Sequence, residues 1–70
     1  MKLYELKEGD VFFTTRKYSL PDTHKKSNTF ICIRHYTDKN GNRKTKCLAA
    51  NYKHPELKYF DSNKDIIIKP

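Results

Sequence analysis

The chain has 70 residues, a formal net charge of +7, a pI near 9.5 and a mean hydropathy of −0.95. A chain of this length forms one domain, residues 1–70, and buries only about 60% of its unfolded surface. It has no long apolar run, no basic amphipathic stretch, no lipidation motif and no apolar signal-peptide core, so we expect a cytoplasmic protein without a membrane partner.

The N-terminal part predicts one strand followed by a long loop. Gly9 and Asp10 indicate a turn, because glycine accepts positive φ and aspartate can bond its own backbone. Residues 11–15 are β-branched and aromatic, which favours a strand. Residues 17–28 are polar and contain Pro21, so we expect them to form a connection.

A tight hairpin is the clearest signal in the chain. Asn40 and Gly41 separate two strand-like runs, residues 29–37 and 44–50. Asn-Gly between such runs is the strongest short-range hairpin signal, because a two-residue turn of matching twist needs positive φ at both positions.

The two cysteines lie in this hairpin. With a two-residue loop, the numbers of opposed residues sum to 81, so Cys32 faces Ala49 and Cys47 faces Arg34. The cysteines are then diagonal neighbours about 7–8 Å apart, which is longer than the usual disulfide span. We therefore expect both thiols to be reduced and to fill space in the packing.

The C-terminal part predicts two short strands. Residues 57–60 form the first and residues 66–68 the second. Residues 61–65 between them are too polar for a strand and too few for an α-helix, so we expect a 3₁₀ turn there. No segment has a sustained apolar period of 3.6 residues, so we expect no α-helix.

This order of elements resembles small SH3-like barrels of the bacterial and phage type, as does the opening motif Leu6-x-x-Gly9-Asp10-x-Phe12. The resemblance implies an all-β, five-stranded barrel with a long first loop and a 3₁₀ turn before the last strand. Because the chain has no tryptophan, we do not carry over the proline-rich peptide recognition of eukaryotic SH3 domains.

Alternation along the hairpin predicts two different faces. The expected core face is mainly aliphatic, with His35 and Lys46 at its turn end; its apolar members are Ile31, Ile33, Leu48 and Ala50. The expected outer face is mixed, and its members are Phe30, Cys32, Arg34, Tyr36, Thr45, Cys47, Ala49 and Asn51.

The positive charge is concentrated in one part of the chain. Residues 16–54 hold ten lysines and arginines against two aspartates, a net charge of +8. Basic side chains interleaved with aromatic rings are used to hold phosphates and stack bases. We therefore expect the hairpin 29–50 and the loop 16–28 to bind nucleic acid. The candidate contact residues are Arg16, Lys17, Tyr18, Lys25, Lys26, Arg34, Tyr36, Lys39, Arg43, Lys44 and Lys46, with Tyr52, Lys53 and His54 as a possible extension.

Two other interpretations of the basic surface stay open. The chain could be a protein-interaction module, such as a phage or mobile-element regulator or inhibitor that binds an acidic host protein. The charges could also serve solubility alone. Unpaired edge strands permit homodimerisation, and the sequence does not decide between a monomer and a homodimer.

The sequence gives little sign of catalysis or of a metal. It has no glycine-rich phosphate loop, no H-E-x-x-H and no G-x-S-x-G. Four zinc ligands are conceivable, namely Cys32, His35, Cys47 and His54. A regular strand places Cys32 and His35 on opposite faces, and only a bulge would bring them together. We therefore expect no enzyme activity, no metal and no cofactor.

Overall fold

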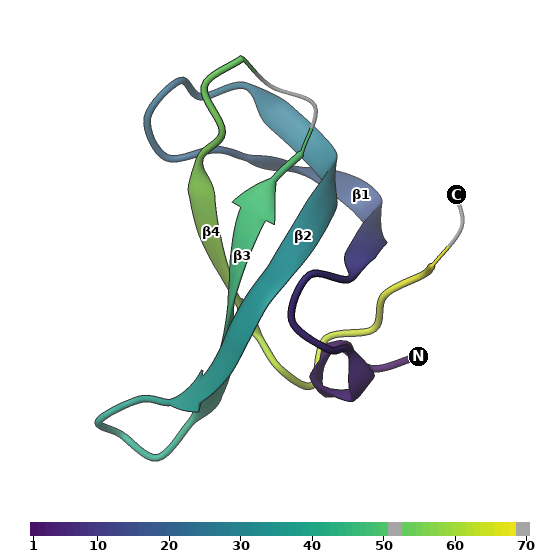
Figure 1. Cartoon of the computed structure of the whole chain (residues 1–70). Coiled ribbons are helices and arrows are strands. Elements are labelled where there is room, and N and C mark those ends of the chain that lie inside the picture. Colours follow the sequence, from purple (N-terminus) through teal and green to yellow (C-terminus); the bar gives the residue numbers. More distant parts are fainter. Residues whose placement is uncertain (51–52, 69–70) are drawn as a thin grey trace.

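The computed structural model describes residues 1–50 and 53–68. It contains a 3₁₀ turn, η1 (Leu3–Glu5), and four strands, β1 (Val11–Ser19), β2 (Lys26–Thr37), β3 (Arg43–Ala49) and β4 (Leu57–Asp61). The strands form one antiparallel sheet in the order β1-β2-β3-β4, which curls into a half-barrel (Figure 1). The prediction of an all-β fold is confirmed.

The prediction of a fifth strand is wrong. The segment 66–68 makes only an isolated bridge with β1, in which the N–H groups of Phe13 and Ile67 each bond the other's carbonyl at 2.7 and 2.9 Å. The N–H of Ile66 instead bonds the carbonyl of Met1 at 2.8 Å. Because neighbouring residues of this segment bond different partners, no continuous ladder forms.

The 3₁₀ turn lies at the opposite end of the chain from its expected place. Residues 61–65 form a simple turn, in which the Asp61 carboxylate accepts the N–H of Asn63 at 2.8 Å. In η1, by contrast, the Glu5 carboxylate accepts the N–H of Lys2 at 2.7 Å, and Leu3 is fully buried.

The first connection is shorter than expected, because β1 and β2 pair further along the chain. Tyr18 lies opposite Ser27 after an irregularity in the register, so only residues 20–25 remain as a loop. Glu56 fastens this loop: its carboxylate accepts the N–H of Asp22 at 2.6 Å and both the N–H and the hydroxyl of Thr23. These bonds, above all the one from the Thr23 hydroxyl, lower the pKa of Glu56.

The core lies inside the curl of the sheet. Three phenylalanine rings form its centre, with ring centroids 5.1 to 6.4 Å apart. The buried apolar residues are Leu3, Leu6, Phe12, Leu20, Phe30, Cys32, Cys47, Ala49, Phe60 and Ile66. A narrow half-barrel has room for these rings because the facing positions on β2 and β3 are small.

The predicted faces of the hairpin are therefore partly inverted. Phe30 and Cys32 are fully buried, whereas Ile31, Ile33 and Leu48 lie on the outer face and keep partial contact with solvent. Two departures from the assumed register explain the inversion, one at the turn and one within β2.

The turn has a three-residue loop rather than a two-residue one. The N–H of Asp38 bonds the carbonyl of Asn42 at 2.8 Å, and the N–H of Gly41 bonds the carbonyl of Asp38 at 3.0 Å. Gly41 has a φ of +83°, which suits the left-handed last position of such a loop. The Asp38 carboxylate accepts the N–H groups of Asn40 and Asn42, both at 2.9 Å.

A β-bulge at Ile33 is the second departure. Arg34 pairs with Lys46, but Cys32 pairs with Cys47, so Ile33 has no partner on β3. An extra residue of this kind reverses the alternation beyond it. Phe30 and Cys32 can therefore point inward while Arg34 points outward from the same strand.

Candidate nucleic-acid interface

A cluster of basic and aromatic side chains lies on the outer face of β2, β3 and β4 next to the hairpin turn. The register places Arg34, Lys46 and Tyr59 side by side, and it places Tyr36 directly opposite Lys44. We call these five residues the outer cluster. Four of them, all except Tyr59, were predicted from the sequence. Lys46 was expected on the core face, and this is corrected because the three-residue turn shifts the register and aligns Lys46 with Arg34.

Tyr59 is the member that sequence analysis missed. Its ring lies perpendicular to that of Tyr36, with 6.3 Å between the ring centroids, and 52% of Tyr59 is exposed. The signal was present in the alternation of β4, because a buried Phe60 requires its neighbour Tyr59 to point outward.

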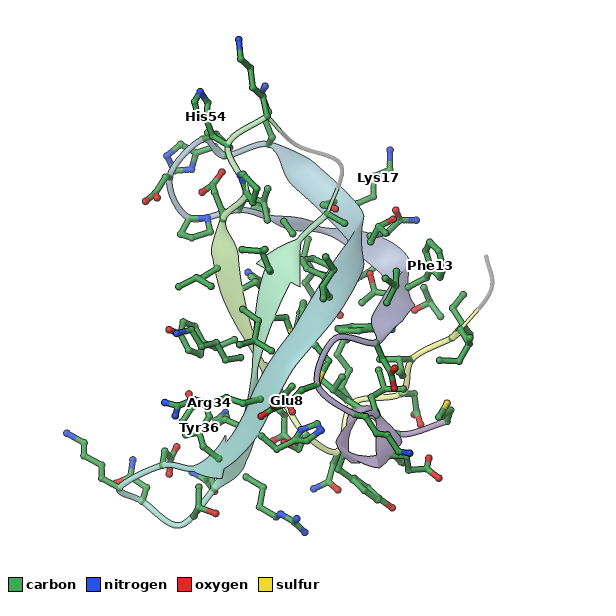
Figure 2. All side chains as sticks on the ribbon, in the orientation of Figure 1. Glu8, Phe13, Lys17, Arg34, Tyr36 and His54 are labelled. Atoms are coloured by element: carbon green, nitrogen blue, oxygen red, sulfur yellow. The ribbon has the colours of Figure 1, made fainter. Side chains whose placement is uncertain are left out.

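The side chains of Arg34 and Tyr36 lie next to each other on the outer face (Figure 2). The Arg34 guanidinium lies 5.8 Å from the centroid of the Tyr36 ring. Such cation–π contacts contribute about 0.5–1 kcal/mol at exposed sites. The contact covers part of Tyr36 and leaves Tyr59 as the more accessible ring.

His35 holds the strand segment that carries Arg34 and Tyr36. Its Nε2 lies 2.8 Å from the carbonyl oxygen of Leu6, and its Nδ1 lies 2.7 Å from the hydroxyl of Thr45. A carbonyl can only accept, so Nε2 carries a proton. The Thr45 hydroxyl in turn lies 2.8 Å from that of Ser62. This buried chain of hydrogen bonds fixes β2 from the inner side.

The cations of the outer cluster form no ion pair within the described residues, and two carboxylates, those of Asp38 and Asp61, lie near Lys44. Within residues 1–50 and 53–68, the one ion pair joins Lys2 to Asp65, at 2.9 Å. Asp61 lies opposite Lys44 across β3 and β4. Asp38 directs its carboxylate into the turn, where the N–H of Asn42 is the main cause of its lowered pKa.

The hairpin turn adds exposed positive charge to the same end of the molecule. Lys39 and Arg43 are both exposed. The end of the β2–β3 hairpin projects beyond the rest of the half-barrel (Figure 1). These two side chains therefore extend the positive charge of the outer cluster to the tip of the hairpin.

The basic residues of β1 and the first loop form a separate region. Lys17 lies at the far end of the sheet from Arg34 and Tyr36 (Figure 2). The predicted residues there are Arg16, Lys17 and Tyr18 on β1 and Lys25 in the first loop, and Lys26 at the start of β2 pairs with Ser19 at the end of β1. The structure thus does not merge the two basic regions into one surface.

Tyr18 packs against the core rather than presenting its ring for stacking. Its ring meets that of Phe60 edge-on, with 5.1 Å between the centroids. The Arg16 guanidinium lies 4.6 Å from the Tyr18 ring centroid, and the Lys64 ammonium donates to the Tyr18 hydroxyl. Hydrogen bonds from Arg16 and Lys64 lower the pKa of Tyr18.

A small hollow lies beside the first loop. It has a volume of about 130 Å³ and is lined by Thr23, Lys25, Lys53 and His54. His54 and Lys53 therefore belong to this end of the molecule and do not extend the outer cluster. Tyr52, the other proposed extension, lies outside the described residues.

The cysteines lie closer than the assumed register placed them. Cys32 and Cys47 are directly opposed and buried as free thiols. The bulge also brings the Cys32 sulfur to 3.8 Å from Nε2 of His35. The expectation that these two side chains lie on opposite faces of a regular strand was therefore wrong. Even so, the described part of the chain holds no group of three or more His, Cys, Asp or Glu side chains suited to a metal.

Burial disfavours the thiolate form of both cysteines. Desolvation, with a smaller contribution from Cys32, raises the pKa of Cys47 to about 12. Desolvation also raises the pKa of Cys32. A nucleophilic cysteine needs the opposite shift.

Comparison with known proteins found no match among protein-family models, curated proteins or solved structures. Among the residues that the structure describes, none belongs to a helix long and apolar enough to cross a membrane.

Proposed function

We propose that this protein is a non-enzymatic nucleic-acid-binding module whose interface is the outer cluster together with the hairpin turn. The observation that carries the proposal is the gathering of three cationic side chains, Arg34, Lys44 and Lys46, around two tyrosine rings on one open sheet face. Lys39 and Arg43 at the turn supply further phosphate contacts.

The charge distribution supports an anionic polymer as the partner. The formal net charge is +7, and the cations of the outer cluster form no close ion pair among the described residues. Each phosphate that such a cation neutralises releases a counterion, so binding is favoured by entropy and weakened by salt. The tyrosines add surface on which bases of any sequence can stack.

The salt dependence of binding tests this function. With about five phosphates contacted, one for each cation of the outer cluster and the turn, log K falls against log salt with a slope of about −3.5 for a single strand or about −4.5 for a duplex. Fluorescence anisotropy with labelled oligonucleotides between about 50 and 200 mM salt measures the slope. An affinity that does not change over this range contradicts the proposal.

A matched pair of charge reversals locates the interface. Lys44→Glu/Lys46→Glu changes the outer cluster, and Lys17→Glu/Lys25→Glu makes the same change of net charge in the separate basic region. We expect the first pair to abolish measurable binding and the second to weaken it only modestly. Equal losses would mean that overall charge, rather than the outer cluster, governs binding.

An acidic protein surface is the second candidate partner, as expected of a phage-type regulator of a host protein. The observation that favours it is a row of apolar side chains across the outer face, Val11, Ile31, Leu48 and Leu57, with 46% of Val11 and 38% of Leu57 exposed. Purification from nuclease-treated lysate distinguishes the two, since a stoichiometric acidic protein that remains bound favours this candidate.

We further propose that the half-barrel is SH3-like. The support is the order of elements, in which a loop follows the first strand, a three-stranded meander comes next, and a C-terminal segment bridges back to the first strand. An experimental structure whose curled sheet superimposes on SH3-like barrels would support this assignment, and one with a different strand order would contradict it.

A further inference from the structure

Three rows of directly opposed residues cross the outer face of β2, β3 and β4. From the hairpin turn inward they are Tyr36–Lys44–Asp61, Arg34–Lys46–Tyr59 and Ile31–Leu48–Leu57. On β3 and β4 each row lies two residues from the next, and two residues of a strand span about 6.6–6.8 Å.

This spacing has a consequence for any nucleic acid that lies along the rows. Stacked bases in one strand of a duplex follow each other every 3.4 Å or so, which is about half the distance between rows. Bases seated on successive rows must therefore separate from one another. Only an unpaired strand can separate its bases in this way without losing base pairs.

The side chains of the rows suit separated bases. Tyr59 offers an accessible ring, and Leu57 on the next row is 38% exposed, so a base leaving Tyr59 meets an apolar surface. Lys44 and Lys46 lie between the strands that carry Tyr36 and Tyr59. Lys46 lies level with Tyr59 and Lys44 lies one row nearer the turn, so they are placed to hold the phosphates beside a base at Tyr59 and on its turn side.

We propose that the outer face binds single-stranded nucleic acid, with bases against Tyr59, Tyr36 and Leu57 and phosphates against Arg34, Lys44 and Lys46. This inference rests on the proposed function and specifies its ligand. The strand runs across the rows from the hairpin turn toward the apolar row.

Duplex binding by the projecting hairpin is the competing geometry. A two-stranded ribbon can enter the major groove of B-form DNA. In that arrangement Lys39 and Arg43 at the turn would make the main contacts, whereas Tyr59 and Leu57 would stay outside the groove. The two geometries therefore depend on different residues.

The experiment compares one sequence in two forms. Anisotropy titrations use a labelled strand of about 12 nucleotides, within the usual range of single-strand site sizes, and the duplex formed with its complement, both at about 50 mM salt. The variants are Tyr59→Leu and Leu57→Ser. Tyr4→Leu is the matched control, because Tyr4 is 46% exposed but lies on η1.

We expect the single strand to bind at least tenfold more tightly than the duplex. Tyr59→Leu should weaken single-strand binding at least fivefold, since stacking on one aromatic side chain contributes about 1–3 kcal/mol per base. Leu57→Ser should weaken it by a smaller factor, and Tyr4→Leu should leave it unchanged.

Two results would overturn this inference and leave the proposed function intact: tighter binding of the duplex, or single-strand binding that neither Tyr59→Leu nor Leu57→Ser affects. Absence of binding to both forms at low salt would overturn the proposed function together with this inference.

Discussion

The inverted faces of β2 can be tested by truncating two neighbouring residues. Phe30 is fully buried and contacts the rings of Phe12 and Phe60, with centroids 5.8 and 5.1 Å away. Phe30→Ala should therefore cost about 3–5 kcal/mol of unfolding free energy, the usual loss for a buried phenylalanine. Ile31→Ala should cost about 1 kcal/mol, because a side chain in contact with solvent leaves no closed cavity.

The size of the protein makes the larger loss severe. At about 0.05–0.15 kcal/mol per residue, a domain of this length has only about 4–10 kcal/mol of total stability. Phe30→Ala could abolish cooperative unfolding, so Phe30→Leu provides a milder variant with an expected loss of about 1–2 kcal/mol.

Urea denaturation followed by far-UV circular dichroism measures these differences. Equal slopes of free energy against urea in all variants would show that only stability has changed. The register assumed from the sequence makes the opposite prediction, with Ile31 in the core. A loss for Ile31→Ala that equals or exceeds that of Phe30→Leu would refute the assignment of faces made here.

Three further predictions concern residues that fix the framework. Glu56→Gln should lower the melting temperature at pH 7. Because folding lowers the pKa of Glu56 below its ordinary 4.5, its contribution is complete above that value and disappears as the pH falls through the folded pKa. The melting temperatures of the unchanged protein and of the variant should therefore converge in acid. A difference in melting temperature that does not change with pH would contradict the role of the Glu56 charge. His35→Leu should cost about 1–3 kcal/mol, because the Leu6 carbonyl loses its imidazole donor and the buried Thr45 hydroxyl keeps only its contact with Ser62. Adding Thr45→Val should recover part of the loss. If the losses of unfolding free energy for His35→Leu and Thr45→Val simply add in the double variant, the contact between these two side chains is refuted. Gly9→Ala should cost about 1–2 kcal/mol from the backbone alone, since φ is +91° and nothing lies within 4 Å of an added Cβ. An unfolding free energy in urea that Gly9→Ala leaves unchanged would show that the backbone of the turn adjusts to alanine.

The sequence located the hairpin correctly but could not define its turn. Asn40-Gly41 suits a two-residue loop and also a three-residue loop with glycine in the left-handed region. The choice depends on Asp38, whose carboxylate binds two N–H groups of the loop. A side chain outside the Asn-Gly pair therefore shifts the register by one residue.

The inward and outward faces were ambiguous for a related reason. Residues 30–33 are all apolar or small, so either phase of the alternation gives a plausible core. The bulge at Ile33 has no local sequence signal, since isoleucine is a good strand residue. Arg34 and Tyr36 were nevertheless assigned outward correctly, because a charged side chain constrains its end of the strand more strongly than apolar neighbours do.

The part of the candidate site that lies on β2 and in the turn could be predicted from the sequence. Tyr59 required the pairing of β3 with β4, a contact between segments that local patterns do not reveal. Separating the outer cluster from Lys17 and Tyr18 also required the full sheet, because sequence proximity had suggested one continuous basic surface.

The bulge at Ile33 also affects how this hairpin can change during evolution. Its inner part must fit the three phenylalanine rings, whereas residues between Tyr36 and the turn lie beyond the core and follow a simple alternation. Matched insertions of two residues on both strands there would lengthen the projecting arm and keep every buried side chain in place. Reach and charge at the tip can thus diverge between descendants of this protein while the half-barrel stays constant.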